Sequence, residues 1–183
     1  MTKKKMLLHS CCAPCTSGVV GQLEEYDITL FFYNPNLDSL EEYNRRLEAL
    51  YTLVECMNRD YNYNLKVIAI PYNHEEFTTK IAGLENEPEG GSRCKVCIGL
   101  RLDFAGQYAK ENGYDIFAST LSISPHKDYQ MINSLGDSIS KKYGIEYLPS
   151  NFKKNDGFLN SIKLSKEYGI YRQRYCGCKN TDL

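Results

Sequence analysis

Short apolar stretches alternate with longer stretches of helical spacing along the whole chain. The apolar stretches are typical of buried strands, and the sequence predicts five of them, at residues 5–10, 28–33, 65–70, 115–119 and 144–148. Between and after them the pattern predicts helices at residues 16–25, 40–59, 75–82, 95–112, 126–142 and 158–168. This alternation predicts one α/β domain over residues 1–183, with a mainly parallel, Rossmann-like sheet flanked by helices.

Local signals mark where several of these helices begin and end. Ser39 and Glu42 have the spacing of a capping box, which favours a helix start at residue 40. Gly113 and Gly169 stand where helices should stop. The last stretch, 171–183, has no regular pattern, so we expect a bound metal to fasten it and the stretch to close over the site.

The composition is that of a folded globular protein. The chain has 183 residues, enough for one ordinary domain, with 42 % apolar and 25 % charged residues. No apolar stretch approaches the roughly 20 residues of a membrane span. The three lysines near the start precede only Met6, Leu7 and Leu8, too few for the apolar region of a signal peptide. We therefore expect a cytoplasmic protein with no membrane partner.

The charge is unevenly distributed. Residues 141–183 carry a net charge of +5 and the rest of the chain −6, which together give the overall −1. A basic surface suits an anionic partner such as nucleic acid. A solvated helix face explains Lys163 and Lys166 equally well.

Cysteine is the residue type that departs most from the average. Seven of the eight cysteines fall in three tight groups, which are Cys11, Cys12 and Cys15; Cys94 and Cys97; and Cys176 and Cys178. Since the cytosol keeps thiols reduced, such grouping indicates metal binding or redox catalysis. The eighth, Cys56, is expected to be an inert buried thiol.

The first group follows the first predicted strand and opens the first helix. Ligands of open α/β sheets bind at the carboxyl ends of the strands, and a helix amino terminus favours thiolate over thiol. Because adjacent residues direct their side chains differently, we expect Cys11 and Cys12 to serve two neighbouring centres, or one centre and a free thiol.

The number of thiols separates the possible metal sites. A C-x-x-C such as Cys94 and Cys97 is shared by redox pairs, zinc knuckles and iron–sulfur sites. Between Cys176 and Cys178, Gly177 allows the backbone to turn. One zinc takes four ligands and leaves three thiols unused, whereas a 4Fe-4S cluster and a second metal, or redox thiols, would employ them all. A zinc staple of the second and third groups remains open.

Other polar candidates lie at the same edge of the sheet. His126 and Asp128 follow the fourth strand and can supply protons; alternatively Ser124 caps a helix whose solvated first turn contains them. Asn34 and Asn36, in a turn after the second strand, can contact a substrate. The lone histidines His9 and His74 are expected to be structural. No phosphate-binding loop, dinucleotide fingerprint or zincin motif occurs, which disfavours nucleotide hydrolysis and dinucleotide redox chemistry.

Five segments together resemble one known family. They are LLHSCCAPC (7–15), FFYNPNLDSLEEYNRR (31–46), GSRCKVCIGLRL (91–102), STLSISPHKD (119–128) and LSKEYGIYRQRYCGC (164–178). In this combination the chain resembles the QueH type of epoxyqueuosine reductase over almost its whole length. The resemblance implies a cobalamin-independent enzyme that removes the epoxide oxygen from epoxyqueuosine at the wobble position of a tRNA anticodon. It also implies a fold akin to adenine-nucleotide alpha hydrolases, a 4Fe-4S cluster and a second metal ion, expected to be iron.

The resemblance extends to individual residues. The cysteines that match the family's positions are Cys11, Cys12, Cys94, Cys97, Cys176 and Cys178. Of these we expect Cys12, Cys94, Cys97 and Cys176 to bind the cluster. At Cys15 some members carry aspartate, from which we infer that Cys15 ligates the second metal. The residues expected to contact the substrate are Asn34, Asn36, Ser122, Tyr171, Arg172 and Arg174.

Epoxide deoxygenation takes two electrons and two protons and releases water. We hypothesise that the second metal binds the epoxide oxygen and that the cluster passes on electrons from an external donor. Protons would come from His126, Asp128 or water. Arg172, Arg174, Lys153 and Lys154 would grip the anticodon stem-loop, with the flipped base stacked on Tyr171 or Tyr175.

Three other classes of protein remain as alternatives. A tRNA-thiolating or nucleotide-activating enzyme on this fold needs a glycine- or serine-rich loop where this chain has Cys-Cys-Ala-Pro-Cys. A zinc-stapled nucleic-acid-binding protein would contain about one zinc and no iron. A thiol–disulfide reductase would use Cys94 and Cys97 as free thiols.

Overall fold

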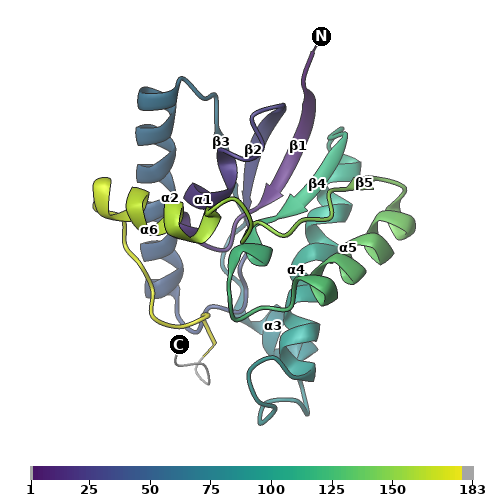
Figure 1. The fold of residues 1–183 in the computed structure, drawn as a ribbon. Helices are drawn as coiled ribbons and strands as arrows, with labels where there is room; N and C mark the ends of the chain where they lie inside the picture. Colours follow the sequence, from purple (N-terminus) through teal and green to yellow (C-terminus); the bar gives the residue numbers. More distant parts are fainter. Residues whose placement is uncertain (1, 179–183) are drawn as a thin grey trace.

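The computed structural model describes residues 2–178 and contains one five-stranded sheet (Figure 1). All neighbouring strands pair in parallel, in the order β3-β2-β1-β4-β5. The strands are β1 (Lys4–His9), β2 (Tyr26–Phe32), β3 (Lys66–Ala69), β4 (Ile116–Ser119) and β5 (Glu146–Tyr147). The predicted α/β fold with a Rossmann-like parallel sheet is confirmed.

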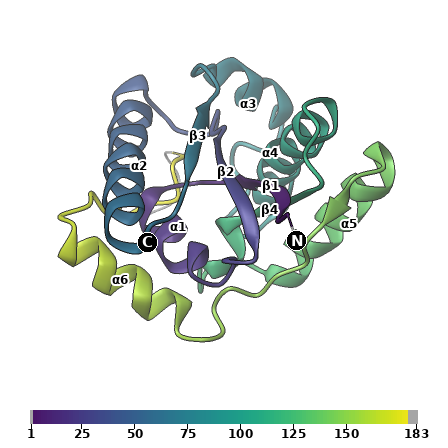
Figure 2. The same cartoon turned by 90° about the horizontal axis from the view of Figure 1, so that it is seen from above.

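Helices cover both faces of this sheet. They are α1 (Ala13–Val20), α2 (Leu40–Tyr61), α3 (His74–Lys80), α4 (Ser92–Glu111), α5 (Tyr129–Tyr143) and α6 (Gly157–Glu167), with a 3-10 turn, η1 (Thr120–Ile123), after β4. Helices α1 and α2 lie on one face, with α6 packed outside α1, and α4 and α5 lie on the other (Figure 2). Among the described residues no helix is long and apolar enough to cross a lipid bilayer.

Capping side chains explain two of the helix starts that differ from the prediction, those of α1 and α5. Helix α1 begins three residues earlier than residue 16 because Cys12 is its cap, with Sγ accepting a hydrogen bond from the Cys15 N–H at 3.4 Å. Helix α5 begins at Tyr129 rather than residue 126 because Asp128 caps it, its carboxylate accepting from the Gln130 N–H at 2.8 Å. The expectation that Ser124 caps this helix is therefore wrong.

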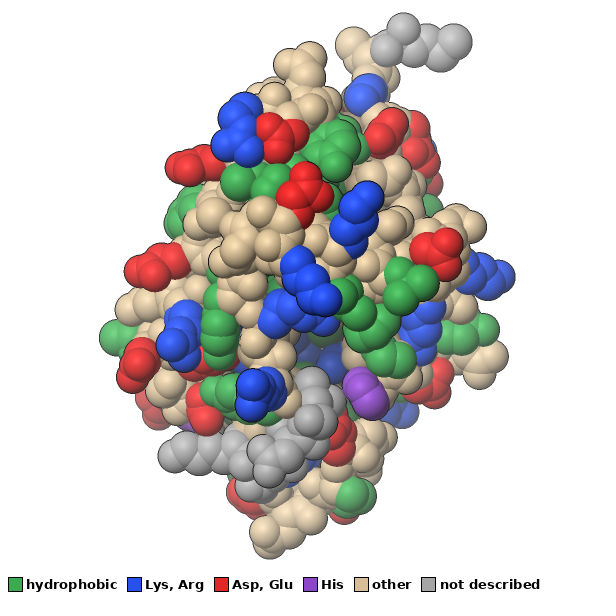
Figure 3. All heavy atoms as spheres, turned by 60° about the vertical axis from the view of Figure 1, so that its left-hand side comes forward, with side chains coloured by type: hydrophobic (Ala, Val, Ile, Leu, Met, Phe, Trp, Pro, Cys, Tyr) green, Lys and Arg blue, Asp and Glu red, His purple; other side chains and the backbone are tan. Residues whose placement is uncertain are grey.

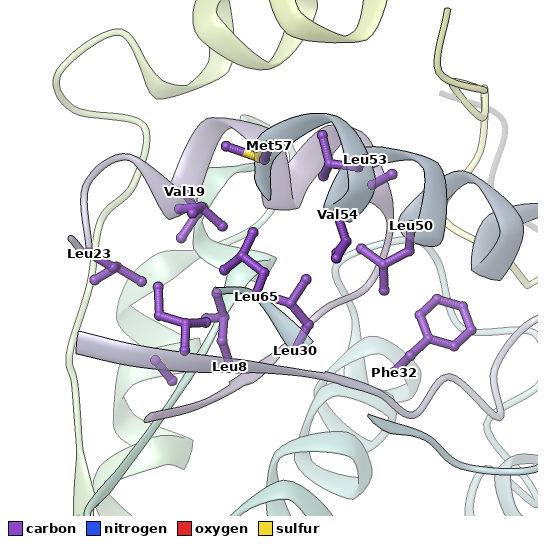
Figure 4. Close-up of a cluster of buried hydrophobic side chains, with 14 of the residues drawn as sticks. Leu8, Val19, Leu23, Leu30, Phe32, Leu50, Leu53, Val54, Met57 and Leu65 are labelled. Atoms are coloured by element: carbon purple, nitrogen blue, oxygen red, sulfur yellow. The ribbon is translucent and has the colours of Figure 1, made fainter. Parts of the chain in front are cut away.

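The strands supply the core from both of their faces. Leu8, Leu30 and Phe32 point toward α1 and α2, where they pack with Leu50 and Leu53 (Figure 4). The alternate residues of the same strands, such as Leu7 and Phe31, pack against α4 and α5 on the opposite side. Burial on both faces explains why these strands read as continuous apolar runs.

The centre of the sheet is a topological switch point. After β1 the chain passes to α1 on one face, and after β4 it passes through η1 to α5 on the other, so the two neighbouring carboxyl ends open a crevice. His9 joins these strand ends: its ring lies 3.0 Å from both Ser119 Oγ and the Tyr33 carbonyl oxygen. Burial, with the nearby charge of Arg101, lowers the pKa of His9 to about 4, so the imidazole is neutral and structural, as predicted.

Helices α1 and α6 touch backbone to backbone. A Cβ added to Gly18 would lie 2.3 Å from the Gly157 carbonyl oxygen, closer than real contacts allow. The close approach brings α6, which follows the loop after β5, against the helix that carries the first cysteine group.

We expect Gly18→Ala to destabilise the protein by about 2 kcal/mol, because α6 must move away. The matched control is Gly99→Ala in α4, where the added Cβ meets nothing closer than Leu135 Cδ2 at 3.9 Å. The control should be neutral or stabilising by up to about 1 kcal/mol. Urea denaturation measures both; equal stabilities for the two variants would contradict the account of this contact.

Candidate metal centre

The first cysteine group forms a compact triad at the start of α1. The Sγ atoms of Cys11, Cys12 and Cys15 all lie within 4.8 Å of one another, and those of Cys11 and Cys12 are 3.8 Å apart. The expectation that Cys11 and Cys12 point in different directions is wrong. Cys12 has an extended backbone as the helix cap, which turns its side chain back over the first helical turn toward Cys15.

The three thiols share their protons unequally. Hydrogen bonds from Cys12 and Cys15 hold the pKa of Cys11 well below its usual value, against the effect of burial. The same interactions raise the pKa of Cys12 to about 12, its hydrogen bond to Cys11 being the largest cause, and raise that of Cys15 well above normal. Cys11 is therefore the thiol of the triad that loses its proton most easily, which suits the binding of a cation.

A second group combines a helix start with the C-terminal segment. Cys94 and Cys97, in the first turns of α4, line a cavity of about 50 Å³ together with Cys176 and Cys178. Within residues 2–178, no three of these four sulfurs lie within 4.8 Å of one another. A tetrahedral zinc with bonds of about 2.3 Å needs its sulfurs within roughly 4 Å, so this group is more open than a closed zinc site.

The two groups adjoin at the carboxyl edge of the sheet. A larger cavity of about 150 Å³ is lined by Cys11, Cys15 and Cys176, and Cys176 also lines the smaller cavity. Burial raises the pKa of Cys97 to about 11. Among its charged neighbours, Arg101 lowers this pKa and the other thiols of the second group raise it. Six thiols from three distant parts of the sequence thus line two neighbouring cavities, and Cys12 lies beside them in the triad.

Two cations, the buried Arg101 and the half-buried Lys127, lie between these thiols. Arg101 is only 2 % exposed, and Lys127 donates a hydrogen bond from Nζ to Cys176 Sγ at 3.3 Å. In the part of the chain that the structure describes, no carboxylate lies within salt-bridge distance of either. Burial lowers the pKa of both groups, but negative charge on Cys176 and Cys11 outweighs it, so both pKa values are raised. Thiolates are the counter-charge available to them.

A third cation, Arg46 of α2, fastens the C-terminal segment. Its Nε pairs with the Glu42 carboxylate at 2.6 Å, while its two Nη atoms donate to the carbonyl oxygens of Tyr175 and Cys176 at 3.2 and 3.1 Å. The Tyr171 hydroxyl donates to the same carboxylate at 3.0 Å. This ion pair helps to hold residues 171–178, which have no regular structure, and fastening by a metal stays a prediction; residues 179–183 of the predicted closing tail lie outside the described part.

Gly177 provides the turn that the sequence predicts between the last two cysteines. Its φ is +135°, and its carbonyl oxygen accepts from the Asp38 N–H at 2.9 Å. An added Cβ would lie 2.6 Å from Leu37 Cδ2. The segment therefore reaches the loop after β2 only with glycine at this position.

The predicted proton donors lie at the mouth of the site. His126 is exposed and lines both cavities, whereas Asp128 lines the smaller one and also caps α5. Their position is compatible with proton transfer, which stays a prediction.

The predicted substrate residues after the strands have different surroundings. Asn34 is buried and donates to the Ser10 carbonyl oxygen at 3.0 Å, so it fixes the loop. Asn36 lines the smaller cavity, with Oδ1 buried and unpartnered. Ser122 is buried beside Ser150 and lines neither cavity.

The predicted substrate residues of the C-terminal segment also differ in whether they line a cavity. Arg172 lines the larger cavity and donates to the Ser161 carbonyl oxygen at 3.2 Å, and Arg174 is exposed. Tyr171 lines neither cavity, because its ring lies under the Arg45 guanidinium, 4.6 Å from the ring centroid. Tyr175 lines the larger cavity but faces Arg46.

Three residues considered in the sequence, Lys153, Lys154 and Cys56, line neither thiol-bearing cavity. Lys153 donates to the Lys127 carbonyl oxygen at 2.9 Å, whereas Lys154 borders a separate hollow beside α1 and α6. Cys56 is half-buried on α2 rather than buried, and lines neither thiol-bearing cavity.

Sequence reasoning missed the cations Arg46, Arg101 and Lys127. A signal existed for two of them. Arg101 interrupts the buried face of α4, and Arg46 stands four residues after Glu42, the spacing of an ion pair on one helix face. Lys127 had no such signal, because its contact with Cys176 joins residues 49 positions apart.

Comparisons with known proteins agree on one family. A family model described as epoxyqueuosine reductase QueH matches residues 6–182. Epoxyqueuosine reductase QueH of Streptococcus pyogenes serotype M1 is 44 % identical over 177 residues, covering 96 % of this chain and 69 % of that protein. The protein of that name from Thermotoga maritima is 36 % identical over 176 residues, covering 94 % and 88 %.

A solved structure resembles the fold. It is described as a predicted subunit of tRNA methyltransferase from Methanocaldococcus jannaschii and covers 90 % of this chain and 74 % of its own, with a TM-score of 0.51. At 15 % identity this similarity concerns the fold alone.

We expect Arg46→Met to release the C-terminal segment, because it leaves Glu42 buried without its cation and frees two carbonyl groups. The loss of stability should be about 3 to 5 kcal/mol, and in the metal-free protein Cys176 and Cys178 should be alkylated faster than in wild type. Arg46→Lys keeps the charge but not the fork of donors. Its stability and its alkylation rates should lie between those of wild type and Arg46→Met.

The control is Arg45→Met on the exposed side of the same helix turn, which removes only a contact with the Tyr171 ring. It should change stability by less than about 1 kcal/mol. Alkylation followed by peptide mass spectrometry measures the rates; unchanged rates in a folded Arg46 variant would show that the ion pair does not hold the segment.

Proposed function

Because this chain belongs to the QueH family of epoxyqueuosine reductases, we propose that it removes the epoxide oxygen from epoxyqueuosine in the anticodon of tRNA to give queuosine. The reaction takes up two electrons and two protons and releases water. It needs a reductant, a Lewis acid for oxygen and a source of protons. The observation that carries the proposal is the convergence of thiols from all three cysteine groups around Arg101 and Lys127, which have no carboxylate within salt-bridge distance among the described residues.

The donor set fits an iron–sulfur cluster beside a second metal. We assign the cluster to the open second group, through Cys94, Cys97 and Cys176, and the second metal, proposed to be iron, to the triad with Cys11 and Cys15. When bound, the cluster would supply single electrons from an external donor, and the second metal would polarise the epoxide oxygen.

Two thiols compete to be the fourth ligand of the cluster. Cys12 is the one predicted from the sequence, but its sulfur lies with the triad. Cys178 lines the same cavity as the other three. The iron content of single serine variants distinguishes them.

The chain's own cations prepare the site for negative charge. Lys127 donates to Cys176 Sγ, and Arg101 lies near Cys97, Cys176 and Cys11. Hydrogen bonds and positive charge beside ligating sulfurs stabilise the more reduced, more negative state of a cluster. His126, exposed at the mouth of both cavities, can pass protons between solvent and the bound substrate.

Basic side chains suit the phosphates of a tRNA anticodon arm. Arg172 lies at the larger cavity and Arg174 is exposed close by, while Lys153 adjoins Lys127. Figure 3 shows Lys and Arg side chains gathered around a hollow on one face of the molecule, beside apolar side chains. We propose phosphate contacts for Arg172, Arg174, Lys153 and Lys154, and place the protein in the cytoplasm with its substrate.

Anaerobic reconstitution with iron and sulfide tests this function. The protein should gain the broad absorption of thiolate-to-iron charge transfer near roughly 400 nm. With a reductant it should convert epoxyqueuosine tRNA to queuosine tRNA, detected by mass spectrometry as the loss of one oxygen atom. Cys97→Ser should abolish both, whereas Cys56→Ser, which changes a thiol outside the two cavities, should abolish neither.

Contrary outcomes indicate the alternatives. One zinc per chain without iron or sulfide would favour a zinc-stapled binding protein. Free, alkylatable Cys94 and Cys97 in the protein as purified without oxygen would favour a thiol–disulfide reductase.

A further inference from the structure

The larger cavity combines two thiols of the triad with side chains that the metal chemistry does not use. Cys11 and Cys15 line it together with the apolar Pro14, Leu121 and Ile123, and Lys127 and Arg172 line it as well. At about 150 Å³ it is of a size that admits one aromatic ring. A cavity lined by thiols and apolar side chains suits a flat ligand whose ring contacts the apolar side chains and whose reacting group points at the sulfurs.

One amide group in this cavity lacks a partner. Gln173 lines the cavity, and its Oε1 is buried with no hydrogen-bond partner in the structure. A buried acceptor left unpaired is unfavourable by about 1 to 3 kcal/mol, so such groups are rare unless a ligand completes them. The missing partner is a hydrogen-bond donor.

Neighbouring residues fix the position of Gln173. On one side Arg172 donates to the Ser161 carbonyl oxygen, and on the other Arg46 holds the carbonyl oxygens of Tyr175 and Cys176. The amide is therefore carried by a segment anchored at both ends, and it can select a ligand without first being ordered.

An aromatic side chain is available at the rim. Phe158, in the first turn of α6, lines the cavity and is 37 % exposed, so its ring is accessible to a ligand. Tyr171 and Tyr175, expected from the sequence to stack on the base, are engaged by Arg45 and Arg46. Phe158 is thus the aromatic side chain of this cavity whose ring contacts no cation among the described residues.

We propose that the larger cavity takes the flipped nucleobase of the tRNA, with Phe158 stacked on its face and Gln173 Oε1 accepting from an N–H of its Watson–Crick edge. This inference rests on the proposed function and adds the specificity-determining residue. The substrate base is a 7-deazaguanine, whose Watson–Crick edge carries N–H donors. Gln173 lines the same cavity as Cys11, Cys15 and Cys176, so a ligand whose base lies at Gln173 can extend its epoxide side chain toward the thiols.

Binding of three anticodon stem-loop RNAs to the reconstituted protein, without reductant, tests the inference. The RNAs differ only at the wobble position, which carries epoxyqueuosine, guanosine or purine riboside, the last having no N–H donor at that edge. Wild type should bind the guanosine RNA about tenfold more tightly than the purine riboside RNA. Gln173→Met, which keeps the side-chain length but not the acceptor, should bind these two equally.

Two further variants separate stacking from edge recognition and serve as controls. Phe158→Ala should weaken binding of all three RNAs about tenfold while keeping the guanosine preference. Gln107→Met makes the same exchange on α4, where the amide only bonds Glu111, and should change nothing.

The outcomes distinguish this inference from the function on which it rests. A wild-type protein that fails to bind the epoxyqueuosine RNA contradicts the proposed function. A protein that binds it, but keeps the guanosine preference in the Gln173 variant or full affinity in the Phe158 variant, overturns the assignment of these residues and leaves the function standing.

Discussion

Buried positive charge without matching carboxylates is the constraint on which the rest of the site depends. Arg101 is buried and Lys127 half-buried at the carboxyl edge of the sheet, and Glu42, a buried carboxylate among the described residues, is paired with Arg46. Charges in such surroundings are strongly unfavourable unless they are compensated. The surrounding thiols can provide that compensation once they ionise, and thiolates are what iron binds. The cations and the thiolates therefore stabilise each other's charged forms.

The fold brings these groups together in three ways. The switch point between β1 and β4 places Cys11 beside the crevice, and the cap of α1 draws Cys12 and Cys15 to it. The first turns of α4 present Cys94 and Cys97 from the other face of the sheet. The Glu42–Arg46 pair then holds the C-terminal segment, so that Cys176 and Cys178 line the same cavity as Cys94 and Cys97. The cap of α1 and the contacts of Arg46 use backbone groups that the helix end and the C-terminal segment would otherwise leave unsatisfied.

Local patterns predicted the fold well, and contacts between distant residues explain where prediction failed. The apolar runs identified all five strands, because strands buried on both faces are apolar throughout. Helix starts were misplaced where the cap is an unusual residue, as with Cys12. For the site, the cysteine groups could be found from spacing, but the direction of each sulfur could not. Arg46 and Arg101 left a signal in their positions along the helices, whereas an isolated lysine such as Lys127 reads as solvent-exposed, and only its tertiary contact with Cys176 shows otherwise.

Anomalous scattering at the iron edge, from crystals of the anaerobically reconstituted protein, tests the central claim most directly. The account predicts strong iron density enclosed by Cys94, Cys97 and Cys176, and a separate iron peak beside Cys11 and Cys15, with Arg101 and Lys127 next to the ligating sulfurs. A single peak at the zinc edge, or iron bound away from these sulfurs, would contradict it.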